Sequence, residues 1–369
     1  MTRHPRIATS SRPRVPELLE IREADGAFAR VEEWLAGHGF FGQDADDLVA
    51  DVYLGYGLSQ SIRRDASRPP PEPCPALPLA ACTLRGSQTQ PLAGSLAIGA
   101  WERTWTVAEY GAAIEDVRAA IGRGDVYQVN LVQHLSATFA GDPHALAARL
   151  ALLRPLQPEP FVTDTWAVVS ASPELFLTRR GDRVWTMPIK GTRPRGGAAE
   201  LRGSEKDAAE HVMIVDLERN DLSRVCTAGT VRWPELMATR ELAGVEHMVS
   251  TVEGTLRDGV GLAEILDATF PGGSVTGAPK IAAVDIIAQL EPVGRGASMG
   301  AVGQVYGNGD FDLALTIRTF AIADGAIHLW VGGGIVWDSD PATEVEESWT
   351  KARPLLDAIG SRTPEGALA

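Results

Sequence analysis

The chain has 369 residues, of which 44% are hydrophobic and 22% charged, and its formal net charge is −14 at pH 7. Its length suits one large domain or two ordinary ones. The acidic excess argues against nucleic-acid binding, because such proteins usually present a basic face to phosphates. No apolar run approaches the roughly 20 residues that a membrane-spanning helix needs. The basic N-terminus lacks the apolar segment of a secretory signal, so we expect a cytoplasmic protein without membrane association.

Residues 1–95 form a short N-terminal segment that we expect to pack on the rest of the chain. It contains a predicted helix around 25–37 and a proline-rich linker or loop over 62–80. From 96 to 362 the pattern of strands and helices shows no second break, which predicts a single larger domain.

Four helix starts are marked by capping residues: Thr106 with Glu109, Asp142-Pro143, Ser204 with Asp207, and Asp340-Pro341. Between the helices, strands are predicted over 126–139, 166–178, 183–190, 228–234, 247–256, 301–306, 311–323 and 326–337. Strands that come in groups indicate an α+β fold rather than strict β-α-β alternation.

One face of the strand over 126–139 is polar. Gln128, Asn130 and His134 alternate with apolar side chains that point the other way. Such a face either meets solvent or lines a wet cavity, and the residues leave both interpretations open.

Single charges interrupt two apolar strands. Glu174, in SASPELFL, would have a raised pKa if it were buried and could then act as a general acid, whereas on an edge strand it would face water. Lys190, in MPIKGTRPRG, precedes Arg193 and Arg195. It is either part of a solvated basic loop or a reactive amine whose pKa burial and the two arginines would lower.

Carboxylates on two predicted helices could bind a cation. Glu210 lies on an apolar helix face. It either reaches solvent from the border of that face, or it is buried, in which case its carboxylate must be paired with a cation, protonated or bound to a metal. Glu344, Glu347 and Lys351 share a face of the last helix, which a surface salt bridge would explain equally well. Oxygen ligands from two helices would suit Mg²⁺, whereas the lack of HExxH and of a Cys/His cluster argues against zinc.

Two glycine-rich stretches flank these elements. Three consecutive glycines over 332–334 indicate the close approach of a ligand or another backbone. FPGGSVTGAPK, residues 270–280, lacks the Lys-Ser/Thr of a nucleotide-binding loop and predicts a turn feeding a helix with Pro279 at its first position. That helix start could bind a carboxylate, or the turn could only cap the helix.

Taken together, these segments resemble the chorismate-utilising enzymes, which include anthranilate, isochorismate, salicylate and aminodeoxychorismate synthases. The resemblance covers about residues 105–360 and rests on motifs in the family order, including GDVYQVNL, SASPELFL, PIKGTRPRG, AEHVMIVDLERNDLSRV, FPGGSVTGAPK and GGGIVWDSDPATEVEESWTKA. It implies an α+β fold of large antiparallel or mixed sheets, flanked by helices around a central active-site cleft. Residues 96–362 would be the chorismate-binding catalytic domain.

Lys190 distinguishes branches of this family. Relatives that make anthranilate usually have alanine here, whereas Pro-Ile-Lys-Gly-Thr is similar to the aminodeoxychorismate synthases, whose lysine is understood to attack C2 of chorismate before ammonia adds at C4. Gln128 agrees with ammonia, because water-using relatives carry a lysine base at that position. The resemblance favours ammonia-dependent formation of 4-amino-4-deoxychorismate, for 4-aminobenzoate and folate biosynthesis. The alternatives are anthranilate formation and an inactive chorismate-binding regulator.

The resemblance also implies a role for each site residue. Lys190 would be the nucleophile and Glu174 the general acid, while Glu210 and Glu347 would bind Mg²⁺, with Asp207 and Glu344 nearby through water. The residues expected to bind chorismate are Gln128, Gly191, Thr192, His247, Thr276, Gly277, Ala278, Arg318, Gly333 and Lys351. The chain departs from the family at Ser298-Met299 and at Gln304, where aromatic residues are usual. It contains no Cys-His-Glu amidotransferase module, so ammonia is expected from a separate glutamine amidotransferase subunit.

Overall fold

The computed structural model describes residues 17–43, 45–85, 94–194, 196–242 and 245–363. Its α-helices are α1 (Ala27–Gly37), α2 (Val107–Arg123), α3 (Pro143–Leu150), α4 (Ala198–Gly203), α5 (Glu205–Ser223), α6 (Leu262–Thr269), α7 (Lys280–Leu290) and α8 (Pro341–Ala358), with 3-10 turns η1 (Tyr56–Ile62), η2 (Ala151–Leu153) and η3 (Gly273–Val275). Its strands are β1 (Leu18–Ile21), β2 (Val49–Leu54), β3 (Ala80–Leu84), β4 (Leu96–Ile98), β5 (Glu102–Arg103), β6 (Gln128–Gly141), β7 (Phe161–Val162), β8 (Trp166–Ser170), β9 (Leu175–Arg180), β10 (Arg183–Met187), β11 (Ile189–Pro194), β12 (Arg232–Leu242), β13 (Val245–Thr255), β14 (Gly277–Ala278), β15 (Ala301–Tyr306), β16 (Phe311–Leu315), β17 (Thr319–Ala323) and β18 (Ala326–Ile335).

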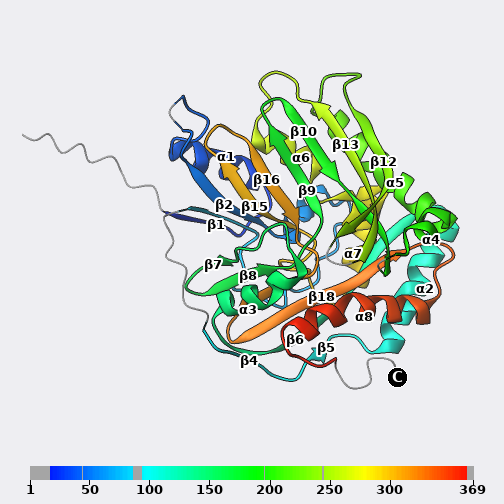
Figure 1. The fold of residues 1–369 in the computed structure, drawn as a ribbon. Helices are drawn as coiled ribbons and strands as arrows, with labels where there is room; N and C mark the ends of the chain where they lie inside the picture. The colour runs from blue at the N-terminus through cyan, green and yellow to red at the C-terminus, as the bar shows by residue number, and fades with distance from the viewer. Residues whose placement is uncertain (1–16, 44, 86–93, 195, 243–244, 364–369) are drawn as a thin grey trace, which may run out of the picture.

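The described strands form two large sheets. The ten-stranded sheet has the order β1-β3-β2-β15-β16-β9-β10-β13-β11, with β12 pairing with β13. The eight-stranded sheet has the order β14-β6-β18-β17-β8-β7, with β4 and β5 pairing with β6. Figure 1 shows most of the first sheet in the upper half of the molecule, and β18 with α8 in the lower half. Antiparallel pairing within both sheets, with helices packed against them, confirms the expected α+β class.

Aromatic side chains join the two sheets. Tyr53 of β2 packs on Trp166 of β8, with ring centroids 5.7 Å apart, and both side chains are buried. Phe270 contacts Phe176 of β9 and Phe28 of α1, with centroids 6.0 and 5.6 Å apart. One hydrophobic core therefore extends from the N-terminal helix to the space between the sheets.

The N-terminal segment is part of the ten-stranded sheet. Strand β2 pairs with β15 over its whole length, from Val49 opposite Tyr306 to Leu54 opposite Ala301. Within 62–80, Cys74 and Leu77 are buried. The proline-rich stretch therefore packs on the body of the protein.

The predicted helix starts are confirmed by their caps. Thr106 and Glu109 form a reciprocal capping box, and the Ser204 side chain accepts a hydrogen bond from the Asp207 amide. Asp142 and Asp340 cap α3 and α8 in the same way, each ahead of a proline in the first turn. These caps fix where α5 and α8 begin and so which of their residues face the sheets.

The predicted strand over 183–190 divides at Pro188 into β10 and β11. Two further predicted strands are also broken, and their breaks meet. The stretch 166–178 divides into β8 and β9, and 311–323 divides into β16 and β17. The Leu315 amide donates to the Glu174 carbonyl over 3.0 Å, and the Ala171 amide donates to the Arg318 carbonyl over 2.9 Å. Arg318 adopts φ 50°, a left-handed conformation that turns the chain. Two charged candidates thus lie where strands leave the sheets.

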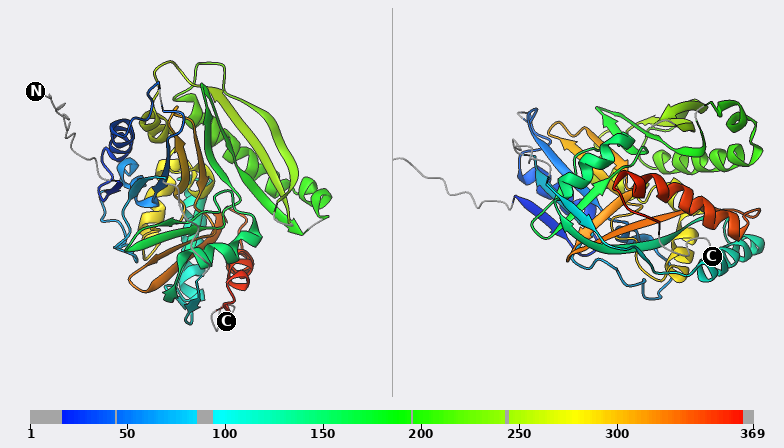
Figure 2. Two further views of the ribbon diagram at one scale, coloured as in Figure 1. Left: turned by 60° about the vertical axis from the view of Figure 1, so that its left-hand side comes forward. Right: turned by 60° about the horizontal axis from the view of Figure 1, so that its bottom comes forward.

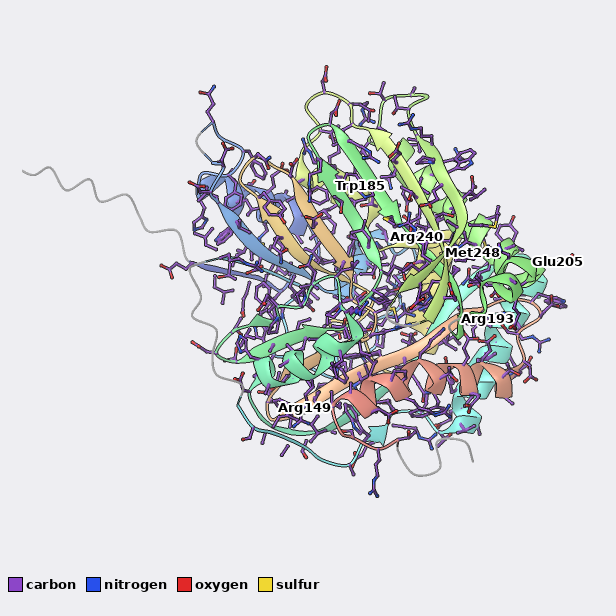
Figure 3. The ribbon with its side chains drawn as sticks, viewed as in Figure 1. Arg149, Trp185, Arg193, Glu205, Arg240 and Met248 are labelled. Atoms are coloured by element: carbon purple, nitrogen blue, oxygen red, sulfur yellow. The ribbon has the colours of Figure 1, made fainter. Side chains whose placement is uncertain are left out.

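Helices cover the sheets on several sides. Helix α8 packs along β18 and beside α2, whereas α5 packs on β13. The Arg149 guanidinium of α3, labelled in Figure 3, donates to the Ile359 carbonyl at the end of α8 over 2.8 Å. Figure 2 shows the β12–β13 hairpin extending to one side of the molecule together with α4 and α5. Among the described helices, none has the combination of length and apolarity required to span a bilayer.

Candidate active site

Lys190 is buried in an ion pair. Its Nζ lies 2.9 Å from Oε1 of Glu210 on α5, and the two side chains are only 13% and 15% exposed. The Gln128 amide of β6 donates to the same glutamate oxygen over 2.9 Å. This burial does not fit a solvated basic loop. It places the amine on a polar network between β11, α5 and β6.

The predicted fall in the pKa of Lys190 is wrong for the structure as it stands. Burial disfavours the ammonium, but the charge and hydrogen bond of Glu210 and the charges of Glu174 and Glu347 outweigh it, so the pKa is raised. Burial likewise opposes the Glu210 carboxylate, yet the Lys190 ammonium holds its pKa below the usual value. In this state the pair is fully ionised.

The arginines expected to act on Lys190 have other roles. Arg193 contacts Glu200 at 3.1 Å and Asp207 at 2.9 Å, so Asp207 is paired with Arg193. Figure 3 shows Arg193 on the same side of the molecule as Glu205, the first residue of α5. Arg195 lies outside the described residues.

Glu174 is buried immediately before β9. It is 5% exposed, and one of its carboxylate oxygens accepts a hydrogen bond from the Ile189 amide over 3.3 Å. Burial raises the pKa of its carboxyl, although the charge of Lys190 partly opposes the shift. Glu174 thus contacts the residue that precedes Lys190 on β11, and a carboxyl with a raised pKa is chemically suited to donate a proton to a leaving group.

Glu347 reaches the site from α8. It pairs with Lys351 at 2.8 Å, with side chains 46% and 36% exposed, and the Lys351 ammonium also donates to the Gly332 carbonyl over 3.0 Å. A Cβ added to Gly333 would lie 3.5 Å from Glu347 Oε1. The predicted face of α8 therefore meets the polyglycine stretch of β18.

The same stretch separates Glu347 from Glu210. A Cβ on Gly334 would lie 2.7 Å from Glu210 Oε1, and consecutive residues of a strand face opposite sides. In the described part of the chain, residues 330–335 of β18 pair with β6 alone, which leaves the other edge open. The two carboxylates thus approach residues 332–334 of this strand, which have no side chains, and the charge of Glu347 acts on Glu210.

Two carboxylates in this setting suit Mg²⁺, a hard cation that prefers oxygen ligands and keeps several waters. No group of three or more His, Cys, Asp or Glu side chains within the described ranges is arranged to hold a metal. The remaining ligands would have to come from water or substrate. Glu344 is buried nearby, and its Oε1 accepts a hydrogen bond from Ser339 over 2.6 Å.

Several expected chorismate-binding residues surround Lys190. His247 is buried, and its Nδ1 lies 3.2 Å from the Gly191 carbonyl. Gly191 has φ 66°, and a Cβ there would lie 2.5 Å from Leu201. Thr192 pairs with His247 through the backbone, but its side chain is outside the described part.

Arg318 supplies a second cation to this region. Burial lowers its pKa, and its charge acts on Glu174 and on His247. A guanidinium that is largely withdrawn from water strongly favours a bound anion. Arg318 therefore fits the expected role of binding a carboxylate.

The glycine-rich turn differs from the prediction by one residue. Helix α7 begins at Lys280, and Pro279 is its N-cap instead of its first residue. Thr276, Gly277 and Ala278 precede the helix, as expected. Gly277 and Ala278 form β14, which pairs with β6, and the Asn130 amide donates to the Thr276 carbonyl over 2.7 Å. The turn is thereby fixed against the strand that carries Gln128.

The structure shows the burial and the hydrogen bonds of two residues that depart from the family pattern. Ser298 is fully buried, and its hydroxyl has no hydrogen-bond partner among the described residues. Gln304 donates to Gln157 over 2.8 Å and to Asp51 over 3.3 Å. Sequence reasoning missed Gly334. The three consecutive glycines were its signal, but the pattern alone did not show which of them meets a carboxylate.

Comparison with known proteins gives a consistent result. The model of a family described as chorismate binding enzyme matches residues 55–357. The chain is 39% identical over 327 residues to anthranilate synthase component 1 of Streptomyces coelicolor, covering 85% of this chain and 60% of that protein. It is 40% identical over 285 residues to aminodeoxychorismate synthase component 1 of Klebsiella aerogenes, covering 74% of this chain and 63% of that protein. The chain thus spans about 60% of the length of these relatives.

A solved structure shows the same fold. Anthranilate synthase component I from Streptococcus pneumoniae superposes with a TM-score of 0.77 at 24% identity, covering 88% of this chain and 84% of that one. Sheets, helices and connections therefore follow an architecture already seen in solved structures.

Proposed function

Because the chain belongs to the chorismate-binding enzyme family, we propose that it converts chorismate and ammonia to 4-amino-4-deoxychorismate and water. The observation that supports this reaction is the position of Lys190. Its side chain is largely buried, its Nζ lies 2.9 Å from Glu210, and the amide of the preceding residue, Ile189, donates a hydrogen bond to Glu174. The family resemblance assigns a nucleophilic lysine at this position to aminodeoxychorismate synthases and an alanine to anthranilate synthases.

Lys190 and Glu174 share the first chemical step. Lys190 first loses its ammonium proton to water, and its neutral amine then forms a bond to C2 of chorismate. Both ring double bonds shift, and the C4–O bond breaks. Glu174 gives its proton to the departing hydroxyl, which leaves as water. Ammonia then adds at C4 and the Lys190–C2 bond breaks, restoring the free lysine after proton return. Burial raises the pKa of Glu174, which favours the protonated form that this step requires.

Charged groups of the chain bind the dianionic substrate. Arg318 and Lys351 attract carboxylates, and the turn over 276–278 positions backbone groups beside Gln128. Glu210 and Glu347 would hold Mg²⁺, which would supply positive charge for the ring carboxylate. His247 keeps Gly191 in place beside the lysine.

Ammonia would come from a separate glutamine amidotransferase subunit in the cytoplasm, and free ammonium would replace it in vitro. The product would serve 4-aminobenzoate and folate biosynthesis. The name component 1 carried by the relatives agrees with a two-component enzyme.

The test is turnover of chorismate with ammonium and Mg²⁺, followed by mass spectrometry and a pyruvate assay. The proposal predicts an amine product with no pyruvate. Lys190→Ala should reduce product formation strongly while chorismate binding persists. An adduct on Lys190 should appear by intact-mass analysis. Unchanged activity in Lys190→Ala with no adduct would contradict the proposed chemistry.

Anthranilate synthase is the second candidate, because relatives of that name are as similar to the chain as the aminodeoxychorismate synthases. It predicts pyruvate and a fluorescent aromatic product in the same assay. Lys190→Ala would then leave that activity largely intact, since alanine is usual at this position in anthranilate synthases.

A further inference from the structure

Each carboxylate proposed to bind Mg²⁺ already contacts a cation of the protein. Lys190 lies 2.9 Å from Glu210, and Lys351 lies 2.8 Å from Glu347. The two pairs are electrostatically connected, since Lys351 acts on Glu210 and Glu347 acts on Lys190. These four residues, which we call the charge cluster, have no net charge.

We infer that the two lysines of the charge cluster are internal counterions, which Mg²⁺ displaces from the carboxylates when it binds. The inference rests on the proposed metal site. Mg²⁺ requires its oxygen ligands at about 2.0–2.1 Å. An ammonium that kept its contact with the same oxygen would stand close to a divalent cation and be repelled strongly. Metal and lysine therefore compete for one carboxylate.

The two competitions are unequal. The Lys190–Glu210 pair is 13% and 15% exposed, whereas Lys351 and Glu347 are 36% and 46% exposed. Exposed ion pairs contribute little, but a buried carboxylate without a partner is strongly disfavoured. Removing the cation at position 190 should therefore favour Mg²⁺ binding far more than removing the cation at position 351.

The structure also keeps Glu210 oriented when its lysine leaves. The Gln128 amide donates to Glu210 over 2.9 Å, and Gln128 is 1% exposed. A neutral side chain of similar length at position 190 would leave this hydrogen bond in place. Mg²⁺ would then find a carboxylate that is already positioned and has no competing ammonium.

The exchange links metal binding to the proposed nucleophile. Lys190 loses its carboxylate contact in the same event in which the metal site is filled. The side chain is then free to approach a bound substrate. While the carboxylates hold no metal, the lysine stays paired.

The test is calorimetric titration with MgCl₂ alone, in the absence of chorismate. Lys190→Met should bind Mg²⁺ at least about tenfold more tightly than the unchanged protein, and Lys351→Met about two- to threefold more tightly. Arg353→Met is the matched control, because Arg353 lies on the same helix and pairs with Glu346 at 2.8 Å. It removes one positive charge without touching the charge cluster and should leave the affinity unchanged.

A thermal measurement gives an independent readout, since a ligand that binds the folded state raises the unfolding midpoint. Saturating Mg²⁺ should raise the midpoint of Lys190→Met more than that of the unchanged protein. If Lys190→Met does not fold, Lys351→Met carries the test through its smaller gain.

Glu210→Gln and Glu347→Gln separate this inference from the proposed site. If both lose Mg²⁺ binding but neither lysine variant binds more tightly than the unchanged protein, the displacement idea is overturned and the metal site stands. If neither glutamine variant changes Mg²⁺ binding, the site itself is wrong. An equal gain in Arg353→Met would show a general charge effect and would also overturn the inference.

Discussion

Gly334→Ala is the substitution whose consequence the structure defines most closely. Its new methyl carbon would lie 1.9 Å from the Gln128 amide nitrogen and 2.7 Å from Glu210 Oε1. Gln128 is only 1% exposed and cannot move into solvent. The methyl group must therefore break the hydrogen bond between Gln128 and Glu210.

Two costs contribute to the expected loss of stability. A hydrogen bond to a charged group contributes about 1.5–3 kcal/mol, and an overpacked methyl costs about 1–3 kcal/mol. We expect unfolding to become easier by roughly 3–5 kcal/mol and the thermal midpoint to fall by several degrees. Turnover should fall further, because Glu210 loses its position.

The assay is a double-mutant cycle in which urea denaturation gives the free energy of unfolding and the unfolding midpoint of each variant. Gln128→Ala removes the atom that collides, so Gly334→Ala should cost less in that background by at least about 1 kcal/mol. Gly333→Ala is the neighbouring control. Its methyl would meet the flexible end of Lys351 at 3.1 Å, so it should cost little. Strictly additive costs of Gly334→Ala and Gln128→Ala would refute the packing on which the site description depends.

Three further predictions follow from buried charges. The pKa of Glu72 is raised by burial from 4.5 to about 7, so its stabilising effect is full below pH 4.5 and is lost as pH rises to about 7. In urea unfolding, Glu72→Gln should remove about 3 kcal/mol of this decline between pH 4.5 and pH 8; equal pH profiles would contradict it. The Lys280 ammonium lies 2.5 Å from the buried Asp221 carboxylate, and Lys280→Met leaves that carboxylate without a partner. The substitution should lower the free energy of unfolding by about 3–5 kcal/mol, measured by thermal unfolding. An unfolding midpoint within a degree of that of the unchanged protein would contradict this prediction. Glu174→Gln should lower turnover about 10²–10⁴-fold with chorismate binding kept, whereas retained turnover would exclude Glu174 as the acid.

The sequence predicted best what depends on neighbouring residues. The Thr106 capping box and the Ser204 cap involve residues three positions apart, so their pattern is visible in the chain. The position of Glu347 relative to Lys351 follows from helical spacing in the same way. These local rules were enough to place both proposed metal-binding carboxylates on helices.

The electrostatics of Lys190 could not be predicted, because they depend on which distant residues approach it. Arg193 is near in sequence, but it pairs with Asp207, and Glu210 reaches the lysine only because α5 packs on β11 and β13. A raised pKa replaces the expected lowered one for this reason. The breaks before β9 and at Arg318 were missed because continuous apolar runs do not show where a chain leaves a sheet.

The pairing of β2 with β15 has a consequence for synthesis of the protein. Ala50 of β2 pairs with Val305 of β15, so during synthesis β2 leaves the ribosome about 250 residues before the strand that pairs with it. Contacts of such long sequence separation form slowly. Until then β2 presents unpaired N–H and C=O groups to other nascent chains, a known route to aggregation. A chain that ended before residue 301 would keep that edge exposed permanently, and we expect such a fragment to require a chaperone or to precipitate.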